Sequence, residues 1–449
     1  MKQYKKYFKD KKITVMGLGL LGRGIGYTKF LAECGAVLTV TDLKTKEQLA
    51  PALKVLGKFR NITYVLGQHR LKDFQKTDMI IKAAGVPLDS PFIAEARKNR
   101  IPVEMDASLF ARLSPDVTIV GITGTRGKTM TTMLAYEILK ANEKFLKKNV
   151  YLGGNIRGMA TLPLLSKVKG GDIVILELDS WQLQGFGEAK ISPAIAVFTT
   201  FLPDHMNYYK DMKKYFADKA NIFKYQSKDD TLIVRPDMKK LIPKNIKSAL
   251  IIAKAKDVEK YDFIVPGKHQ KENLACAVQV AKIFAIPDPK IKKAVKDFKG
   301  VEGRLQYVKT VDGVKIYNDN NATTPEATMA GIEALSIEQG TKKFVKKIIL
   351  IAGGADKGVD TGQLVKVIDR YCKDVILLDG TGTQKMITHY KLRTPYAIVA
   401  SLKEAAKIAS GVSKKGDIVL FSPAFASFGM FTNEYHRNDE FMKIVKKLK

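Results

Sequence analysis

The chain of 449 residues is 45% hydrophobic and 27% charged, and its length suits two to three globular domains. No apolar run approaches the ~18 residues of a membrane-spanning helix, so we expect no membrane insertion. Its three cysteines are widely separated and its first residues lack the apolar core of a secretory signal, so we expect a cytoplasmic protein without a disulfide framework or a zinc site. The net charge of +31 comes from lysines spread over the whole chain, with no basic stripe interleaved with aromatic residues, so we expect no nucleic-acid partner.

A glycine-rich turn follows the first predicted strand. Residues 12–19 predict a strand running into Gly17-Leu-Gly-Leu-Leu-Gly22 and a helix to about Cys34, and residues 37–42 predict a second strand that ends in Asp42. GxGxxG in a βαβ unit with an acid at the end of the second strand is the dinucleotide fingerprint. Alone it indicates an NAD(P) enzyme, but the same phosphate cradle would equally hold another diphosphate nucleotide such as UDP. Further strands at 78–82 and 102–104 complete a small doubly wound domain, expected over 1–113.

A second glycine turn lies at residues 117–142. The β-branched run that begins at Val117 ends in Gly124-Thr-Arg-Gly-Lys-Thr129, and apolar residues at helical spacing follow. A strand–turn–helix of this kind directs backbone N–H groups and the helix N-terminus at a phosphate. Lys128 adds a cation for the β- and γ-phosphates, and the Thr129 hydroxyl suits Mg²⁺. Two residues separate the glycines where the common P-loop has four, so the sequence predicts a tighter variant; the competing interpretation is a glycine-rich turn with a surface lysine.

Two polar positions follow the next strands. A β-prone run from Asp172 ends in Glu177, and the strand from Ala194 is followed by Asp204 and His205. The carboxyl ends of parallel strands meet at one edge of a sheet, where such folds bind ligands. Glu177 is therefore a candidate Mg²⁺ ligand, although a strand-end acid exposed to solvent is at least as common. His205 is expected at the same edge, in a metal role.

A helix with an unusual lysine comes next. Residues 213–225 have helical periodicity that places Tyr215, Lys219 and Ile222 on one face, and a lysine on such a stripe is usually a surface residue whose stem lies along apolar neighbours. Strands are expected at 231–234 and 249–252, and a helix from the region of Pro266 to Ile286. We expect this nucleotide-binding domain over 114–302. A third α/β domain is expected over 303–449, with strands beginning at Val314, Ile348, Val375 and Asp417.

Taken together, the motifs resemble those of the Mur ligase family over essentially the full chain. In order they are GLGLLG, GTRGKT, GGNI, LELDSWQL, a DHM stretch, GKHQKEN, GR, NDNNATTP, GGADKG and SPAFASF. Within the family the segments Gly153–Ile156, Glu177–Gln182, Asp204–Tyr209 and Ser422–Phe431 are most similar to those of the member that adds D-glutamate to UDP-N-acetylmuramoyl-L-alanine.

The resemblance implies three α/β domains: a Rossmann-like N-terminal domain for the UDP-substrate, a P-loop-type central ATPase domain, and a Rossmann-like C-terminal domain for the amino acid. It implies ATP-dependent amide formation in peptidoglycan precursor synthesis, with ATP and Mg²⁺ as cofactors and with UDP-N-acetylmuramoyl-L-alanine and D-glutamate as partners. ATP would phosphorylate the substrate carboxylate to an acyl phosphate, and the amine of the amino acid would attack it. A monomer is expected.

The resemblance also assigns roles to residues by position. Lys128, Glu177, His205 and Lys219 would be catalytic, and Thr129, Glu177, His205 and Lys219 would hold the metal, Lys219 after carbamylation. ATP would contact Gly124, Thr125, Arg126, Gly127, Lys128, Thr129, Asn273, Arg304 and Asp319. The UDP-substrate would contact Gly19, Leu20, Leu21, Asp42, Asn155 and Gln182, and the amino acid would contact Lys357, Ser427 and Phe428.

Four positions depart from the family pattern. Asn321 stands where the family has a lysine that helps to hold the amino-acid carboxylate, and Gly303 stands where the family has a histidine before Arg304. Thr200 stands where the family has an asparagine upstream of the DH motif, and Glu434 stands where it has a C-terminal phenylalanine. Three of the four belong to the third domain, so the added amino acid is the open part of the assignment.

Other functions compete with this one. A relative with a different acceptor is the nearest: another Mur-type step, or a folylpolyglutamate-synthase-like ligase, against which the GxGxxG domain argues. An NAD(P)-dependent oxidoreductase with an added ATPase module, and a basic nucleic-acid-binding ATPase, are the alternatives from other classes.

Overall fold

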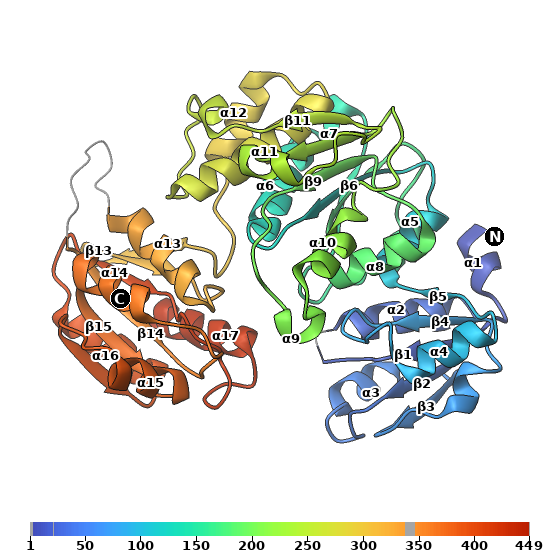
Figure 1. Cartoon of the computed structure of the whole chain (residues 1–449), viewed down its shortest axis with the longest axis horizontal. Helices are drawn as coiled ribbons and strands as arrows, with labels where there is room; N and C mark the ends of the chain where they lie inside the picture. The colour runs from blue at the N-terminus through green and yellow to red at the C-terminus, as the bar shows by residue number, and fades with distance from the viewer. Residues whose placement is uncertain (1–2, 21, 337–345, 449) are drawn as a thin grey trace. The chain divides into compact units, whose positions relative to one another are not determined.

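The computed structural model describes residues 3–20, 22–336 and 346–448. They form two compact units, one of residues 1–260 with 272–294 and one of residues 261–271 with 295–449. The first unit holds two sheets and the second holds one, and helices lie against each sheet (Figure 1). The predicted α/β architecture is therefore confirmed, whereas the boundaries at 113/114 and 302/303 stay predictions.

The first sheet is parallel throughout, in the order β3-β2-β1-β4-β5. The strand order reverses at β1, with β2 on one side and β4 on the other, which makes the carboxyl ends of β1 and β4 the position where such sheets bind ligands. Strand β1 is shorter than predicted and stops before the glycine turn. The strands are β1 (Lys12–Met16), β2 (Val37–Asp42), β3 (Ile62–Leu66), β4 (Met79–Lys82) and β5 (Val103–Glu104), and the helices are α1 (Gln3–Phe8), α2 (Arg23–Glu33), α3 (Ala50–Leu56), α4 (Pro91–Lys98) and α5 (Asp106–Leu113).

The middle sheet is also parallel, in the order β11-β10-β9-β6-β8-β7. Its central strands are almost entirely buried and apolar, as expected of a sheet covered on both faces. The strands are β6 (Thr118–Thr123), β7 (Val150–Gly154), β8 (Ile173–Glu177), β9 (Ile195–Phe198), β10 (Thr231–Val234) and β11 (Ala249–Ile252). The helices are α6 (Lys128–Lys140), α7 (Glu143–Leu146), α8 (Ser180–Ala189), α9 (Met206–Tyr209), α10 (Met212–Ala220), α11 (Lys268–Ile283) and α12 (Asp288–Asp297).

Helix α10 is shorter than its periodicity predicts. The helix ends at Ala220, and the N–H groups of Ile222 and Phe223 bond to carbonyls three residues back, at 3.1 and 3.0 Å, in successive turns. Ile222 is still fully buried, so the apolar stripe continues past the helix end. Lys219 is only 1% exposed, so it is not the surface lysine that such a stripe usually carries.

The first two sheets share one hydrophobic core, built in part from Phe110 on α5 and Phe186 on α8. A buried carboxylate fastens them: Asp106 accepts hydrogen bonds from the backbone N–H groups of Thr161 (2.8 Å) and Leu162 (2.7 Å). Burial raises the pKa of Asp106, and these bonds partly oppose the rise. The glycine turn of the first sheet lies beside the residues that follow β7, since a Cβ at Gly22 would be 3.4 Å from Gly158 Cα.

The second unit contains a six-stranded sheet in the order β12-β13-β17-β14-β15-β16, parallel except for β12, which pairs antiparallel with β13. Two apolar clusters cover its faces, one with α13 and α14 and one with α16 and α17. The strands are β12 (Gln306–Val311), β13 (Val314–Asn318), β14 (Ile348–Gly353), β15 (Cys372–Leu378), β16 (Tyr396–Val399) and β17 (Ile418–Phe421), and the helices are α13 (Pro325–Ser336), α14 (Gly362–Tyr371), α15 (Thr381–His389), α16 (Leu402–Val412) and α17 (Glu434–Lys447).

Candidate active site

The predicted P-loop is a closely packed turn between β6 and α6. A Cβ atom at Gly124 would lie 2.0 Å from Thr199 Oγ1, and one at Gly127 would lie 2.4 Å from Asn273 Oδ1, so neither position has room for a side chain. Both residues also have positive φ angles, 149° and 85°. Lys128 begins α6, and its Nζ donates to the carbonyls of Gly124 (3.0 Å) and Thr125 (3.2 Å). The turn thus has the backbone of a phosphate cradle with its cation folded onto the rim.

Two threonines after β9 hold this turn from the side, and the sequence did not suggest them. Thr199 Oγ1 donates to the Arg126 carbonyl at 2.6 Å, while the Arg126 N–H donates to Thr200 Oγ1 at 2.8 Å. The Thr125 N–H donates to the Thr200 carbonyl at 2.7 Å. Thr200, which departs from the family pattern, therefore has a clear structural role in fixing the cradle.

Glu177 ends β8, directly beside the cradle strand, because Ile122 of β6 and Glu177 are partners in the strand register. The side chain is only 3% exposed. Its Oε1 accepts from Asn155 Nδ2 at 3.3 Å, and its Oε2 has no hydrogen-bond partner among the described residues. A buried carboxylate oxygen left unbonded at the phosphate edge is what a cation site requires.

His205 lies in the loop after β9 in a left-handed conformation, with φ of 56°. Its ring is 4.7 Å from the ring of Trp181 and 6.2 Å from that of Tyr215, measured between centroids. Burial lowers the pKa of His205, and the nearby Lys128 and Lys219 add to that, although Asp204 opposes it. The neutral imidazole, which is the form that binds a metal, is therefore favoured at neutral pH.

Lys219 extends from α10 to the cradle. Its Nζ donates to the Gly124 carbonyl at 3.0 Å and lies 4.9 Å from the Tyr215 ring centroid. The Tyr215 hydroxyl is in turn 3.3 Å from Thr125 Oγ1. Burial and then repulsion by Lys128 hold the pKa of Lys219 well below its usual range, so this lysine is poised to be an uncharged amine.

The donors at this edge suit a hard cation only if further oxygen ligands join them. Among the described residues, no three or more His, Cys, Asp or Glu side chains lie close enough together to hold a metal. The unbonded oxygen of Glu177 does fit a divalent cation, and Thr129, on the first turn of α6, fits the same chemistry. The remaining ligands would have to come from nucleotide phosphates, from water, or from a modified Lys219.

At the predicted UDP end, Asp42 secures the glycine turn. Its Oδ2 accepts from the N–H groups of Leu18 (2.8 Å) and Gly19 (3.0 Å), and the carboxylate is 4% exposed. Leu20 is 57% exposed and open to a ligand, and Leu21 lies outside the described residues. Whether these residues bind uracil stays a prediction.

The two other residues predicted at the UDP-substrate have different surroundings. Asn155 accepts a hydrogen bond from Arg23 Nη2 at 2.7 Å and donates to Glu177, so it lies between the glycine turn and the acid. Gln182 is 2% exposed and forms a capping box with Asp179 at the start of α8. Its contact with substrate stays a prediction: the capping box uses its Oε1 and its backbone N–H, whereas its buried Nε2 has no hydrogen-bond partner among the described residues.

The residues of the third domain that were predicted to contact ATP or the amino acid lie in the second compact unit. Asp319 is buried and accepts from the Leu305 N–H (2.9 Å) and from Ser422 Oγ (2.9 Å), and burial raises the pKa of Asp319 to about 7. Arg304 is close enough to stabilise its charged form. Ser427 is buried, Phe428 is exposed, and Lys357 Nζ donates to Thr323 Oγ1 at 3.1 Å.

Two departures from the family pattern touch each other. The Asn321 N–H donates to the Gly303 carbonyl at 2.9 Å, and a Cβ at Gly303 would lie 3.1 Å from Asn321 Nδ2. Asn321 thus occupies space that a larger residue at 303 would need, so the two substitutions form one local adjustment. Beneath them the buried Arg437, also missed from sequence, donates to both the side chain and the carbonyl of Asn320 and to the Phe425 carbonyl.

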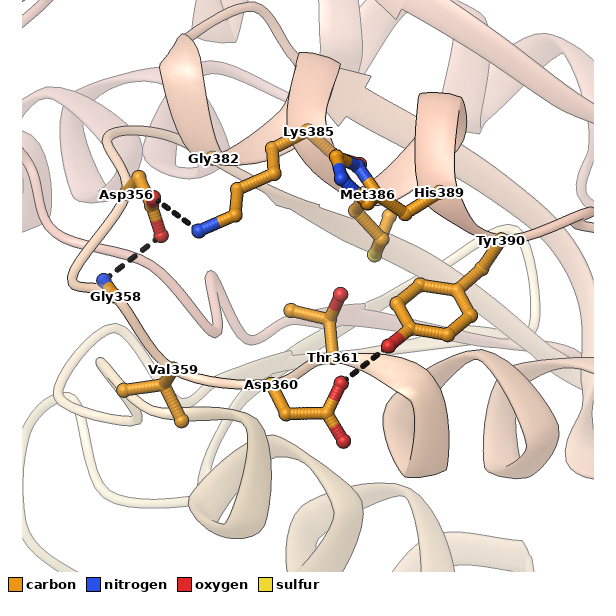
Figure 2. A pocket seen from close by; sticks show the side chains of 10 residues that line it. All are labelled: Asp356, Gly358, Val359, Asp360, Thr361, Gly382, Lys385, Met386, His389 and Tyr390. Carbon is orange, nitrogen blue, oxygen red and sulfur yellow. Dashed lines mark hydrogen bonds and ion pairs between the residues drawn. The ribbon is translucent and has the colours of Figure 1, made fainter.

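A small pocket of about 100 Å³ lies beside the loop that carries Lys357. Figure 2 shows Asp356 directed at Lys385 and at the Gly358 N–H, and Asp360 directed at Tyr390. The Asp356–Lys385 ion pair (2.8 Å) and the Asp360–Tyr390 bond (2.5 Å) fasten the loop to α15. The pocket therefore belongs to the support of the predicted amino-acid site.

Comparison with known proteins agrees with this arrangement part by part. The Mur ligase MurD-like N-terminal domain matches residues 11–104, the Mur ligase middle domain matches 122–264, and the Mur ligase glutamate ligase domain matches 303–425. A protein of Roseiflexus sp. (strain RS-1) named UDP-N-acetylmuramoylalanine--D-glutamate ligase is 35% identical, over 97% of this chain and 98% of its own. The chain belongs to the Mur ligase family.

Other Mur ligases agree in sequence or in fold. Proteins with the same name from Borreliella burgdorferi (strain ZS7) and Clostridioides difficile (strain 630) are 34% and 32% identical, each over 98% of this chain and over 98% and 99% of their own. The solved UDP-N-acetylmuramate-alanine ligase MurC of Thermotoga maritima shares the fold with a TM-score of 0.61 at 18% identity, covering 98% of this chain and 100% of its own. The MurF ligase of the same organism, solved with ADP, has a TM-score of 0.59 at 17% identity, over 99% and 96%. No helix among the described residues is long and apolar enough to cross a membrane.

The buried Asp319 predicts a measurable pH dependence of stability. Its folded-state pKa of about 7 lies above the ordinary 3.8, so between these values the folded chain holds a proton that the unfolded chain has lost. Stability from this group is therefore greatest at low pH and declines as pH rises towards 7. As the pH is raised from 4.5 to 7.5, we expect the thermal midpoint of the wild type to decrease relative to that of Asp319→Asn. The exposed Asp312→Asn is the control, and a difference independent of pH would contradict the expectation.

Proposed function

We infer that this Mur ligase is an ATP-dependent, ADP-forming ligase that adds D-glutamate to UDP-N-acetylmuramoyl-L-alanine in peptidoglycan precursor synthesis. The observation that carries the inference is the convergence of a closely packed phosphate cradle, the unbonded oxygen of Glu177 and the buried Lys219 at one edge of the middle sheet. The names of relatives that align over nearly the whole chain support the choice of substrates. A cytoplasmic location and a monomeric state remain part of this proposal.

The first step is phosphoryl transfer, in which the chain positions the reactants and neutralises charge. The carboxylate of the L-alanyl group attacks the γ-phosphorus of ATP, the bond from that phosphorus to the β,γ-bridging oxygen breaks, and ADP leaves. Backbone N–H groups of the 124–129 turn would hold the phosphates. Lys128, whose amine now donates to two carbonyls of the turn, can exchange those bonds for phosphate oxygens.

The second step is acyl transfer. The amine of the amino acid attacks the carbonyl carbon of the acyl phosphate, a tetrahedral intermediate forms, and inorganic phosphate leaves as the amide bond closes and a proton is lost from nitrogen. We assign Lys357 and Ser427 to the amino acid's carboxylates. Lys357 follows Asp356 in the loop that the Asp356–Lys385 ion pair fastens, and its hydrogen bond to Thr323 supports this assignment.

A divalent cation, Mg²⁺ in this proposal, would be held by Glu177, His205, Thr129 and Lys219. When bound, it would neutralise the charge that develops on the phosphate oxygens. The neutral imidazole of His205 and the orphaned oxygen of Glu177 are suited to it.

Lys219 is proposed to react with carbon dioxide. An uncharged amine forms an N–C bond to CO₂ and releases a proton, giving a carbamate that carries one negative charge. That product would replace a cation by an oxygen ligand directly beside the cradle. The lowered pKa of Lys219 and its contact with the Gly124 carbonyl support the modification.

A Mur-type ligase that adds another amino acid is the second candidate, favoured by one observation. Asn321 stands where the family pattern has a lysine near the amino-acid carboxylate, which removes a cation from that site. Of the predicted amino-acid contacts, only Lys357 then brings a positive charge.

A phosphate-release assay with an amino-acid panel decides between the candidates. Purified enzyme with ATP, Mg²⁺ and UDP-N-acetylmuramoyl-L-alanine should release phosphate with D-glutamate, and far more slowly with L-glutamate or other amino acids. Release that requires another amino acid would favour the second candidate. Turnover of a nicotinamide cofactor instead of ATP would contradict the proposal.

Lys128→Ala should lower ATP turnover by at least about a hundredfold, because the cation assigned to the β- and γ-phosphates is lost, whereas the other cation of the turn, Arg126, is paired with Asp204. Binding of the UDP-substrate, measured by calorimetry, should stay unchanged, since Lys128 lies outside the first sheet. Lys144→Ala, an exposed lysine in the next helix, is the control. Retained turnover in the Lys128 variant would refute its assignment.

Lys219→Ala should lose activity that added short-chain carboxylates partly restore, because a carboxylate can enter the space left by the carbamate and supply the missing oxygen ligand. The matched control is Lys214→Ala, an exposed position of the same helix, which should keep wild-type activity without rescue. A folded Lys219 variant that no carboxylate restores would count against carbamylation.

A further inference from the structure

Arg23 connects the glycine turn of the first sheet to the acid of the middle sheet. It is the first residue of α2, directly after Gly22, and its Nη2 donates to Asn155 Oδ1 at 2.7 Å. The amide of the same Asn155 donates from Nδ2 to Glu177 Oε1 at 3.3 Å. Three side chains therefore form one continuous path between the two predicted ligand sites of the first unit.

The direction of this path follows from hydrogen-bonding chemistry. A guanidinium group can only donate and an ionised carboxylate can only accept, so the amide between them has a single favourable orientation. Arg23 must face Oδ1 of Asn155, and Nδ2 must then face Glu177. With the amide turned over, its oxygen would point at the carboxylate and its amino group at the guanidinium, and both contacts would be repulsive.

Within this path, Arg23 is what selects the side-chain orientation of Asn155. The main chain of Asn155 is already fixed, since its N–H donates to the Glu177 carbonyl at 2.7 Å. Its side chain has two hydrogen bonds, one to Arg23 and one to Glu177. Arg23 also lies close enough to Asp106, the buried acid that fastens the two sheets, for its charge to oppose the rise in the pKa of Asp106.

The orientation has a consequence for Glu177. The bond from Asn155 occupies Oε1 and leaves Oε2 as the oxygen without a partner. A carboxylate held at one oxygen presents the other in a fixed direction, and such support of a ligand from behind commonly governs cation affinity.

We propose that Arg23 is a positioning residue that orients Asn155 and, through it, the free oxygen of Glu177 towards the cation. Arg23 touches neither the reacting atoms nor the cation in this role. The proposal rests on the proposed function, because it takes Glu177 as a cation ligand.

The test measures Mn²⁺ affinity directly. Free Mn²⁺ is titrated by electron paramagnetic resonance in the presence of a non-hydrolysable ATP analogue, with full-length wild type, Arg23→Met and Arg97→Met. Arg97 is the matched control because it also joins the two sheets, through a 3.1 Å ion pair from α4 to Glu188 of α8, but it is far more exposed and has no bond to the path. We expect Mn²⁺ binding about tenfold weaker in Arg23→Met and unchanged in Arg97→Met.

Two results would overturn the proposal: wild-type affinity in Arg23→Met, or an equal loss in both arginine variants, which would indicate a general effect of loosening the sheets. Asn155→Ala provides a further check, because adding Arg23→Met to it should produce no additional loss if the two residues act in one path. Additive losses would contradict the path.

Folding and function are separated by two more measurements. If Arg23→Met does not fold, Arg23→Gln is titrated instead, because its amide can accept as well as donate and so no longer selects one orientation of Asn155; weaker Mn²⁺ binding supports the proposal and unchanged binding overturns it. Glu177→Gln should lose Mn²⁺ affinity, and an unchanged value would overturn both this proposal and the metal assignment. A wild type that binds Mn²⁺ through Glu177 but releases no phosphate would refute the proposed function alone.

Discussion

The site depends on how closely the 124–129 turn is packed. The residues that would meet a Cβ at Gly124 and Gly127 come from the end of β9 and from α11, so two separate parts of the chain pack against one short stretch of backbone. This contact fixes the directions of the N–H groups without any ligand present. It also places the carbonyl of Gly124 where two lysines, Lys128 and Lys219, both donate to it. Of these two amines, the cation of Lys128 raises the electrostatic potential that phosphates would experience, whereas Lys219 is poised to be uncharged.

The same burial sets the chemistry of the neighbouring groups. Lys219 and His205 both have lowered pKa values, since burial and the surrounding lysines disfavour their charged forms. For Asp204 it is the charged form that is favoured. Burial raises the pKa of its carboxyl, but Arg126 and His205 outweigh that effect, and the net pKa is lowered. One small region thus contains neutral bases beside an ionised acid, a combination that surface residues would not show.

The sequence allowed the main lines of this arrangement to be predicted. Strand–turn–helix patterns revealed both glycine turns, and the rule that parallel strands share a carboxyl edge placed Glu177 beside the cradle. Lys219 could be named only through the family resemblance, because its helical periodicity alone suggested a surface lysine. The Thr199–Thr200 clamp, Arg23 and Arg437 were not predicted at all, since each acts on a partner far away in the chain. Asn321 and Gly303 looked like two separate departures until the fold placed them in contact.

Trp181 gives the molecule a local optical probe. It is the only tryptophan of the chain, and its indole ring lies against His205 with its Nε1 buried and without a hydrogen-bond partner among the described residues. Intrinsic fluorescence excited at the red edge of protein absorption therefore originates from a single place, at the proposed metal edge. Ligands that alter the imidazole or admit water to the indole would change the emission without any attached dye.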